Sequence, residues 1–351
     1  MSTLVVKVCK IKEVNPHSNA DKLELAIVNG WQCVVSKNKY KADDLVVYFP
    51  PDTSLPETVT DEFGVTGYCQ RTTDQGMRIR QARLRGEPSF GLIVDLPDNV
   101  DWKEGDTVDE HYGAKKYDPP VKGHGGDILG TNHILFDKFT DIQNLRNFID
   151  VFEDGEDVVC TEKLHGTQVR LVQILDEVEG ELLFAGSKQH PRKRPENDKE
   201  MESHLYWLPY TYQSVKDMFE GLKKDHKVIE IYGETYGRVQ SLRYGINGLA
   251  FRCFALKLDG RYVDFDERVS ICEKYGVPMV PVLYRGPYSL EKIKEVSEGN
   301  TTIADIDQIR EGTVVQPVKE RTHPSIGRCI LKYVSDTYLM GKHAERDTTD
   351  A

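Results

Sequence analysis

The segment CTEKLHGTQVRLV, residues 160–172, decides how the larger part of this chain folds. Apolar and polar residues alternate up to Lys163 and alternate again from Gln168, which predicts a hairpin of two strands joined by a short turn. Gly166 lies in that turn, where it would permit close approach of the backbone to a ligand. A lysine at such a corner is usually a solvated surface residue, and the alternative is a nucleophilic amine that faces a phosphate. Residues further along the chain distinguish the two interpretations.

The composition is that of an ordinary globular protein of 351 residues, with 39% hydrophobic and 29% charged residues. This length fits two domains better than one. The formal net charge of -11 excludes a broadly basic polymer binder. A role on nucleic acid would therefore need local basic patches, because contacts to phosphates carry that affinity.

Neither a membrane span nor a secretory signal is expected. The sequence has no window of about 18 uninterrupted apolar residues, and its first residues alternate like a strand instead of forming a charged and then apolar leader. The seven cysteines show no C-x-x-C and no paired Cys/His spacing, which argues against a zinc site and a disulfide framework. We therefore expect the cytoplasm or another reducing intracellular compartment.

Short alternating segments between residues 4 and 48, followed by more strand-like sequence, predict a small N-terminal β-barrel or sandwich. A stretch dense in Pro and Gly then predicts a linker, and a short helix is expected within residues 139–152. Strands mixed with a few helices predict an α+β domain with mainly antiparallel sheets in the remainder. The expected organisation is a β module over 1–113, a linker and short helix over 114–150, an α+β domain over 151–340 and a polar tail over 341–351.

Charged residues and glycines recur at the corners of the strands expected after residue 157. They occur in EKLHGT (162–167), GSKQHPRKR (186–194), YGETYG (232–237), FRCFALK (251–257), EGTVVQP (311–317) and ILKYVS (330–335). For Lys163 to act as a nucleophile, its amine must be deprotonated part of the time. Glu234 and Glu311 would be turn residues if taken singly, but with such a lysine they can hold a hydrated divalent cation. Lys332 is either a strand residue with its ammonium in water or a second cation that neutralises phosphate charge.

This order of motifs resembles the covalent nucleotidyltransferase superfamily, which comprises ATP-dependent DNA and RNA ligases and mRNA capping enzymes. The resemblance covers roughly residues 157–335, and TEKLHGTQ is most similar to the RNA ligases. The segments NPHSNADKLELAIVNGWQCVV, ADDLVVYFPPDTSLPE and ARLRGEPSFGLIV look like the OB-type module that precedes the ligase domain in one RNA ligase family. The implied fold is α+β: an N-terminal OB-like β-barrel module followed by a nucleotidyltransferase domain with antiparallel sheets.

By this resemblance, Lys163 would attack the α-phosphate of ATP, expel pyrophosphate and hold AMP through a phosphoramidate. The AMP would pass to the 5′-phosphate of an RNA strand, and a 3′-hydroxyl would then displace it. ATP is thus the implied co-substrate, with Mg²⁺ or Mn²⁺ as the metal. Lys332 would contact the α-phosphate, and His165 would act in the later steps, with a structural histidine of the turn as the alternative.

The resemblance also assigns the nucleotide-binding side chains. Glu162 is expected near the adenine edge, and Phe254 would stack on the adenine, with Phe251 as the other candidate and core packing as the competing role of both. Glu234 and Glu311 would bind the ribose or organise the metal through water.

Three positions depart from the family pattern. Lys188 stands where ligases usually carry an arginine that contacts the ribose or the RNA 5′-phosphate, so it keeps the charge and loses the bidentate fork. Gln168 stands where asparagine is common. The last motif usually reads Lys-x-Lys, and here Ile330 replaces the first lysine. Arg328 or the basic loop at residues 192–194 are the candidates to supply the missing charge.

Two clusters of arginines are candidates for RNA contacts. If MRIRQARLR is one strand, its first two arginines share one face and its last two share a face. Each cluster is either a solvated charged surface or a track for the RNA backbone. The candidate RNA-binding residues are Arg78, Arg80, Arg83, Arg85, Arg192 and Arg194.

Three functions remain open at this stage. The leading hypothesis is an ATP-dependent RNA ligase that joins 3′-hydroxyl and 5′-phosphate ends, with RNA and ATP as partners and no membrane. A related DNA ligase or GTP-using capping enzyme is the second. The third is a non-catalytic RNA-binding protein, which would need neither the lysines nor the carboxylates in this order.

Overall fold

The computed structural model describes residues 6–117, 127–129, 136, 139–188 and 190–341. The chain divides into two compact units: unit 1 comprises Met1–Val121, Leu145–Ile149 and Leu339–Ala351, and unit 2 comprises Lys122–Asn144 and Asp150–Tyr338. Each unit combines separate segments of the chain. The domain boundaries expected from the sequence therefore stay a prediction. The expected polar tail beyond residue 341, and part of the expected linker, lie outside the described residues.

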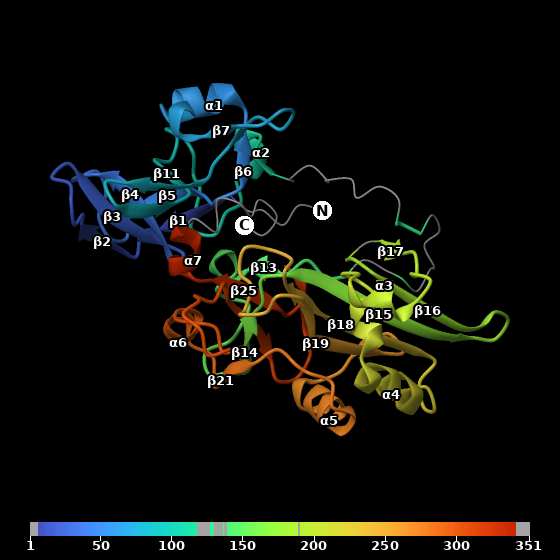
Figure 1. Cartoon of the computed structure of the whole chain (residues 1–351). Helices are drawn as coiled ribbons and strands as arrows, with labels where there is room; N and C mark the ends of the chain where they lie inside the picture. Colours follow the sequence, from blue (N-terminus) through green and yellow to red (C-terminus); the bar gives the residue numbers. More distant parts are fainter. Residues whose placement is uncertain (1–5, 118–126, 130–135, 137–138, 189, 342–351) are drawn as a thin grey trace. The chain divides into compact units, whose positions relative to one another are not determined.

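Unit 1 is built from short antiparallel strands (Figure 1). Its elements are β1 (Lys7–Lys10), β2 (Glu13–Pro16), β3 (Leu23–Val28), β4 (Trp31–Ser36), β5 (Leu45–Phe49), β6 (Thr53–Leu55), α1 (Glu57–Glu62), η1 (Thr66–Tyr68), β7 (Gln70–Arg71), β8 (Met77–Arg78), β9 (Gln81–Leu84), β10 (Glu87–Phe90), β11 (Leu92–Val94), α2 (Asp109–Tyr112) and β12 (Lys115–Lys116). They form the sheets β1-β5-β11, β2-β3-β4, β9-β10 and β12-β6-β8-β7. Asn29 and Gly30 join β3 to β4 at positive φ, the turn geometry that matches the twist of paired strands.

Apolar side chains at alternate positions fill the interior of unit 1. Along β4, Trp31, Cys33 and Val35 are buried while the residues between them are partly exposed, which is the pattern of a strand with one face on a core. Trp31 packs against Phe90 with ring centroids 5.4 Å apart.

The segment MRIRQARLR is not the single strand that its alternation predicts. Arg78 ends β8, which pairs with β6 and β7, whereas Gln81 begins β9, which pairs with β10. Arg85 follows β9 at a φ of 52°. The segment contributes to two different sheets. The prediction that its arginines share strand faces is therefore wrong.

Arg78 belongs to the interior of unit 1. Both Arg78 and Asp52 are 5% exposed, and they form an ion pair in which Nε of Arg78 donates to Oδ1 of Asp52 at 2.6 Å. The guanidinium also lies 4.2 Å from the ring centroid of Tyr117. A planar guanidinium can bond a carboxylate and stack on a ring at the same time, so this arginine is occupied by the fold.

Unit 2 contains two larger sheets and most of the helices. Its elements are β13 (Gln143–Asn144), β14 (Asp157–Lys163), β15 (Thr167–Asp176), β16 (Gly180–Gly186), β17 (Pro191–Arg192), α3 (Asp198–Glu202), η3 (Leu208–Thr211), α4 (Gln213–Leu222), β18 (Val228–Gly237), β19 (Leu249–Leu258), β20 (Arg261–Tyr262), α5 (Phe265–Tyr275), β21 (Val282–Pro287), α6 (Leu290–Ser297), β22 (Gly312–Pro317), β23 (Thr322–His323), β24 (Gly327–Arg328), β25 (Leu331–Val334) and the start of α7 (Asp336–Met340). The sheets have the orders β17-β16-β15-β18-β19-β20 and β13-β25-β22-β14-β21. All named strand pairs are antiparallel except β13 with β25, which confirms the predicted α+β class.

The segment around Lys163 is not a hairpin, contrary to the prediction from its alternation. β14 pairs with β21 and β22 in the smaller sheet, whereas β15 pairs with β16 and β18 in the larger one. Both edges of each strand are therefore taken by other strands, and the turn at residues 164–166 carries the chain from one sheet to the other.

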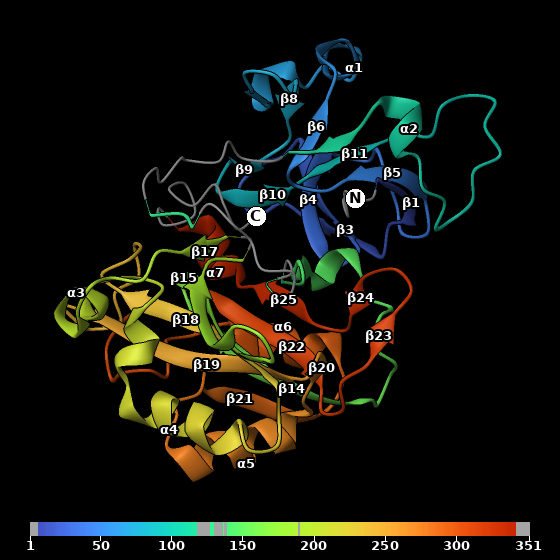
Figure 2. The same ribbon diagram turned by 90° about the vertical axis from the view of Figure 1, so that its right-hand side faces the viewer.

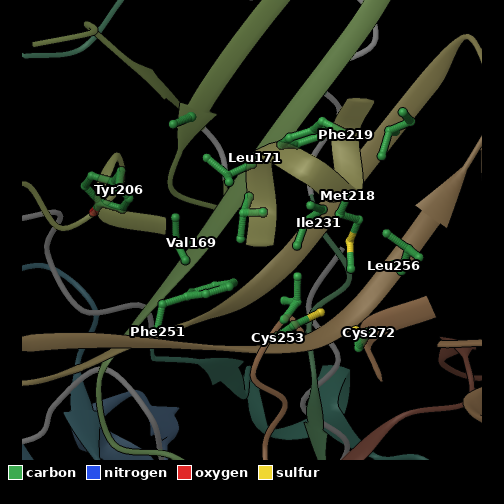
Figure 3. Close-up of a cluster of buried hydrophobic side chains, with 14 of the residues drawn as sticks. Val169, Leu171, Tyr206, Met218, Phe219, Ile231, Phe251, Cys253, Leu256 and Cys272 are labelled. Atoms are coloured by element: carbon green, nitrogen blue, oxygen red, sulfur yellow. The ribbon is translucent and has the colours of Figure 1, made fainter. Parts of the chain in front are cut away.

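One face of the larger sheet is covered by helices (Figure 2). Val169 and Leu171 of β15 point into this interior with Phe251 of β19, and Met218 and Phe219 of α4 pack against them (Figure 3). The side chains between them, such as Gln168, belong to the other face because strand residues alternate. The covered face is thus structural, and the other face is available for a site.

The helix expected within residues 139–152 is instead β13 followed by the 3-10 turn η2 (Leu145–Asn147). Residues 143 and 144 pair with β25 in unit 2, whereas Leu145 and Arg146 are buried in unit 1, so no continuous helix forms. None of the helices in the described ranges has the length and apolar character that a membrane span requires.

The buried pair of Asp52 and Arg78 leads to a prediction about stability. Arg78→Gln should lower the free energy of unfolding by about 3–5 kcal/mol, because it leaves a buried carboxylate without its cation. Arg85→Gln removes the same charge from an exposed turn and should change it by less than about 0.5 kcal/mol. Urea unfolding followed by tryptophan fluorescence measures both, and equal stability of the two variants would contradict the structural role of Arg78.

Candidate active site

The crossing between the two sheets of unit 2 depends on Gly166. A Cβ atom at this position would lie 2.2 Å from the carbonyl oxygen of Thr235 and 3.1 Å from Cγ of Glu234. The carbonyl of Gly166 accepts a hydrogen bond from Nε2 of Gln240 at 2.7 Å. We expected this glycine to make room for a ligand, and the structure gives that room to the backbone of β18. The glycine thereby brings Glu234 next to the turn.

Lys163 and Glu311 form the centre of the site. Nζ of Lys163 lies 2.5 Å from Oε1 of Glu311, and the side chains are 14% and 0% exposed. The strands explain this proximity, since Lys163 pairs across β14 and β22 with Gly312, the residue after Glu311. A Cβ atom on Gly312 would lie 2.1 Å from the carbonyl oxygen of Tyr333, so the pairing with β25 requires a glycine here.

Lys332 lies on the same face of the smaller sheet as Lys163. In the register, Thr161 pairs with Val314, and Val314 pairs with Lys332. Residues two apart on one strand, and residues directly opposite on neighbouring strands, share a face. The sequence-predicted residues Lys163, Glu311 and Lys332 are therefore brought together by three adjacent strands.

His165 is buried beside this pair. Its Nδ1 lies 3.3 Å from Oε2 of Glu311 and 3.3 Å from Oη of Tyr338, and its Nε2 lies 3.0 Å from Oγ of Ser241. Its backbone N–H donates to Oη of Tyr244 at 2.6 Å. Burial raises the pKa of Tyr244 well above the ordinary value, so its phenol stays neutral.

Ser241, Tyr244 and Tyr338 belong to the site, although no sequence motif predicts them. They are 76, 79 and 173 residues from His165, and no pattern in their own segments points to it. The unusual backbone of Tyr244, at a φ of 55°, is visible only in the structure.

The carboxylate of Glu162 is engaged on the other face of the sheet. Oε1 accepts from Oγ1 of Thr301 at 2.5 Å, and Oε2 accepts from the backbone N–H and Oγ1 of Thr302 at 2.8 and 2.7 Å. Alternation along β14 directs Glu162 away from the face of Lys163. Its expected position near an adenine edge stays a prediction, and its side chain ties β14 to the loop after α6.

The second carboxylate and the candidate stacking ring belong to the larger sheet. Glu234 lies opposite Gln168 on one side and Arg252 on the other. The pairing of β18 with β19 slips by one residue, so that Phe254 forms a β-bulge. Phe254 is only partly buried, whereas Phe251 is 2% exposed in the covered core. This contrast favours Phe254 as a ring that a ligand can reach.

The remaining predicted cations differ in their availability. Lys188 forms an ion pair with Asp141. Arg192 is buried and pairs with Asp127 at 2.7 Å, whereas Arg194 is exposed and its guanidinium carbon lies 5.5 Å from the ring centroid of Trp207. Buried, paired arginines serve the fold more readily than they serve a substrate.

The arginines of unit 1 also divide into occupied and available side chains. Arg83 donates to the backbone oxygens of Gly86 and Met340, while Arg78 is buried as described above. Arg80 is half-buried and Arg85 is exposed. Arg80 and Arg85 are therefore the two whose guanidinium groups can reach a ligand without losing a hydrogen bond or ion pair within the described residues.

Arg328 does not replace the missing lysine of the last motif. Ile330 is 2% exposed and belongs to the interior. Arg328 is also buried, pairs with Glu320, and lies 3.7 Å from the ring centroid of Tyr262. Lys332 is therefore the cation that this strand contributes to the site.

Comparison with known proteins identifies two regions of the chain. A family model described as RNA ligase matches residues 156–334, or 179 of the 351 residues. A model described as an OB-fold domain matches residues 5–96, which confirms the expected N-terminal OB-like module. Among curated protein sequences, no significant match was found.

Solved structures of Naegleria gruberi RNA ligase resemble nearly the whole chain. The structure with pyrophosphate is 25% identical, with a TM-score of 0.72 and coverage of 97% of this chain and 99% of that chain. A point variant with AMP and manganese is 25% identical, with the same coverage and a TM-score of 0.73. Another variant, with ATP and manganese, is 24% identical with the same TM-score and coverage, and supports the fold alone.

The match to the RNA ligase model spans β14 to β25 and thus every strand that carries Lys163, Glu234, Glu311 and Lys332. By this match over more than half of its length, the chain belongs to the RNA ligase family.

Proposed function

We propose that this protein is an ATP-dependent RNA ligase that joins 3′-hydroxyl and 5′-phosphate RNA ends through a lysyl-AMP intermediate. The observation that carries the proposal is the contact between the amine of Lys163 and the buried carboxylate of Glu311 where the chain crosses between two sheets. The relatives solved with AMP and with pyrophosphate support it, because these are the two parts into which adenylylation divides ATP.

In the proposed first step, the neutral amine of Lys163 attacks the α-phosphorus of ATP. An N–P bond forms, the bond from the α-phosphorus to the bridging oxygen breaks, and pyrophosphate leaves with that oxygen, while the attacking nitrogen releases a proton to solvent. An ion pair favours the protonated ammonium, so the contact with Glu311 describes a resting state. Substrate binding has to exchange this contact before the amine can lose its proton and react.

Two further transfers complete the proposed reaction. An oxygen of the RNA 5′-phosphate attacks the phosphorus of lysyl-AMP, and the lysine amine leaves and takes up a proton. The RNA 3′-hydroxyl then attacks the 5′-phosphorus, loses its proton, and AMP leaves. We assign the exchange of a proton during these transfers to His165, and its contacts with Glu311 through Nδ1 and with Ser241 through Nε2 support this role.

We assign the divalent cation to Glu234 and Glu311, through water. No group of three or more His, Cys, Asp or Glu that could hold a metal ion occurs in the described residues. Mg²⁺ usually keeps several waters and binds through one or two carboxylates plus substrate phosphates, so two carboxylates beside a triphosphate suffice. When bound, the cation would neutralise phosphate charge. Lys332 would share that task at the α-phosphate, and Lys188 would contact the ribose or the RNA 5′-phosphate.

The first prediction for this function concerns the nucleophile. Wild-type protein incubated with α-labelled ATP and Mg²⁺ or Mn²⁺ should retain label after denaturation, and α-labelled GTP should not label it. Lys163→Ala and Lys163→Arg should both abolish labelling. The arginine variant keeps a cation opposite Glu311 but lacks a usable nucleophile, so it separates chemistry from folding. Labelling of Lys163→Arg, or labelling by GTP alone, would refute the proposal.

A second prediction separates the later transfers from adenylylation. His165→Ala should still form lysyl-AMP but fail to seal 3′-hydroxyl and 5′-phosphate RNA ends, and Tyr338→Phe should slow sealing several-fold by removing one partner of the imidazole. Tyr210→Phe is the matched control, because the hydroxyl of Tyr210 makes no hydrogen bond within the described residues. Gel analysis of adenylylated RNA and of sealed product measures each step. Full sealing by His165→Ala would contradict the assignment.

A third prediction tests the stacking ring. Phe254→Leu should raise KM for ATP by roughly tenfold, because stacking of a base on an aromatic ring contributes about 1–3 kcal/mol. Phe251→Leu should instead lower thermal stability with a smaller effect on KM, since that ring packs in the covered core. If Phe251→Leu raised KM for ATP and Phe254→Leu mainly lowered thermal stability, Phe251 would be the adenine contact instead.

A further inference from the structure

Unit 1 contains a cavity of about 550 Å³ that the proposed chemistry does not use. Its walls come from β4, the segment after it, β9, β11 and the segment from α1 to η1. Figure 1 shows α1 and β7 on the side of unit 1 that carries β11. Among the lining residues are Lys39, Tyr40, Glu62, Tyr68, Arg80 and Asp95.

Arg80 is the unusual cation of this cavity. It is half-buried, yet within the part of the chain that the structure describes it makes neither a hydrogen bond nor an ion pair. Its neighbours in the same segment are engaged: Arg78 pairs with Asp52, and Arg83 donates to two backbone oxygens. A half-buried guanidinium without a partner has lost part of its hydration, so an anion at this wall would compensate it.

Tyr68 supplies an exposed ring at the same cavity. Its side chain is 69% exposed, although it is a large aromatic residue, and Phe63 and Tyr40 also contribute to the lining. Every nucleobase has a π face, so an accessible aromatic ring beside a cation is a platform on which an unpaired base can stack. The volume is suited to one nucleotide rather than to a duplex, which is recognised by its shape across a groove.

The charges of the residues that line the cavity further limit which class of ligand can bind there. Nζ of Lys39 forms an ion pair with Oδ2 of Asp95 at 3.1 Å, and Glu62 adds a second carboxylate. The formal charges of Lys39, Arg80, Glu62 and Asp95 therefore sum to zero. Such a lining disfavours a triphosphate, whereas Arg80 can bond a single phosphodiester and leave the base on the ring.

We propose that this cavity binds one unpaired nucleotide of the RNA substrate, with its base on Tyr68 and a backbone phosphate at Arg80. The inference rests on the proposed function, since it names where the RNA of that reaction is held outside the catalytic unit. Single-stranded RNA presents splayed bases that stack on aromatic side chains, so it matches both features of the cavity.

The test is RNA binding by the full-length protein. Fluorescence anisotropy with a short single-stranded RNA should give a Kd about tenfold higher for Arg80→Gln than for wild type, and at least about fivefold higher for Tyr68→Leu. The slope of log K against log salt should fall in magnitude by about 0.7 for Arg80→Gln, as one phosphate contact is lost. Tyr68→Phe keeps the ring and should bind like wild type. Lys12→Gln removes an exposed charge outside the cavity and is the matched control.

Photocrosslinking of the wild-type protein gives a readout that does not depend on a variant. RNA containing 4-thiouridine should attach to the peptide that contains Tyr68. Crosslinks confined to other segments, or wild-type affinity in both Arg80→Gln and Tyr68→Leu, would overturn the inference. So would binding of free ATP that is lost in Arg80→Gln. Lysyl-AMP formation by the wild-type protein is measured in parallel: its absence refutes the ligase function itself, whereas its presence with unchanged RNA binding refutes the cavity alone.

Discussion

The buried carboxylate of Glu311 is the constraint on which the site depends. A charged group without exposure is tolerated only when it is paired and hydrogen-bonded. Here one oxygen is paired with the ammonium of Lys163 and the other faces Nδ1 of His165. The fold meets this requirement by ending β14 at Lys163 and starting β22 at Gly312, so that the two strands deliver both partners to one point.

Under the proposed function, the same requirement gives the site two states. In the proposed mechanism, the amine of Lys163 stays an ammonium while it pairs with Glu311. A ligand that provides another cation for Glu311 would favour release of the amine, because the buried carboxylate then keeps a partner. The proposed mechanism thereby links activation of Lys163 to the arrival of substrate. Tyr244, Ser241 and Tyr338 hold His165 beside the pair during such an exchange.

Individual residues show which features could be predicted from the sequence and which could not. Lys163, Glu234, Glu311 and Lys332 were identified from motif order. Lys163 and Lys332 are now found on β14 and β25 of one sheet, and Glu311 directly precedes β22, the strand between them. Alternation predicted the strands but assigned two of them to a hairpin, because a local period does not say which strand becomes the neighbour. The same limit applies to Arg78, whose buried partner Asp52 lies 26 residues earlier in the chain.

The sequence by itself determined the class of fold, the order of the site motifs and the family, since strand periodicity and corner residues are encoded locally. Only the tertiary structure decided which residues surround Lys163. It placed Glu162 on the far face against Thr301 and Thr302, gave Phe254 the accessible position through a bulge, and separated available arginines from paired ones. Each of these outcomes depends on contacts between distant segments, because the environment of a charged or aromatic side chain is set by whatever the fold packs against it.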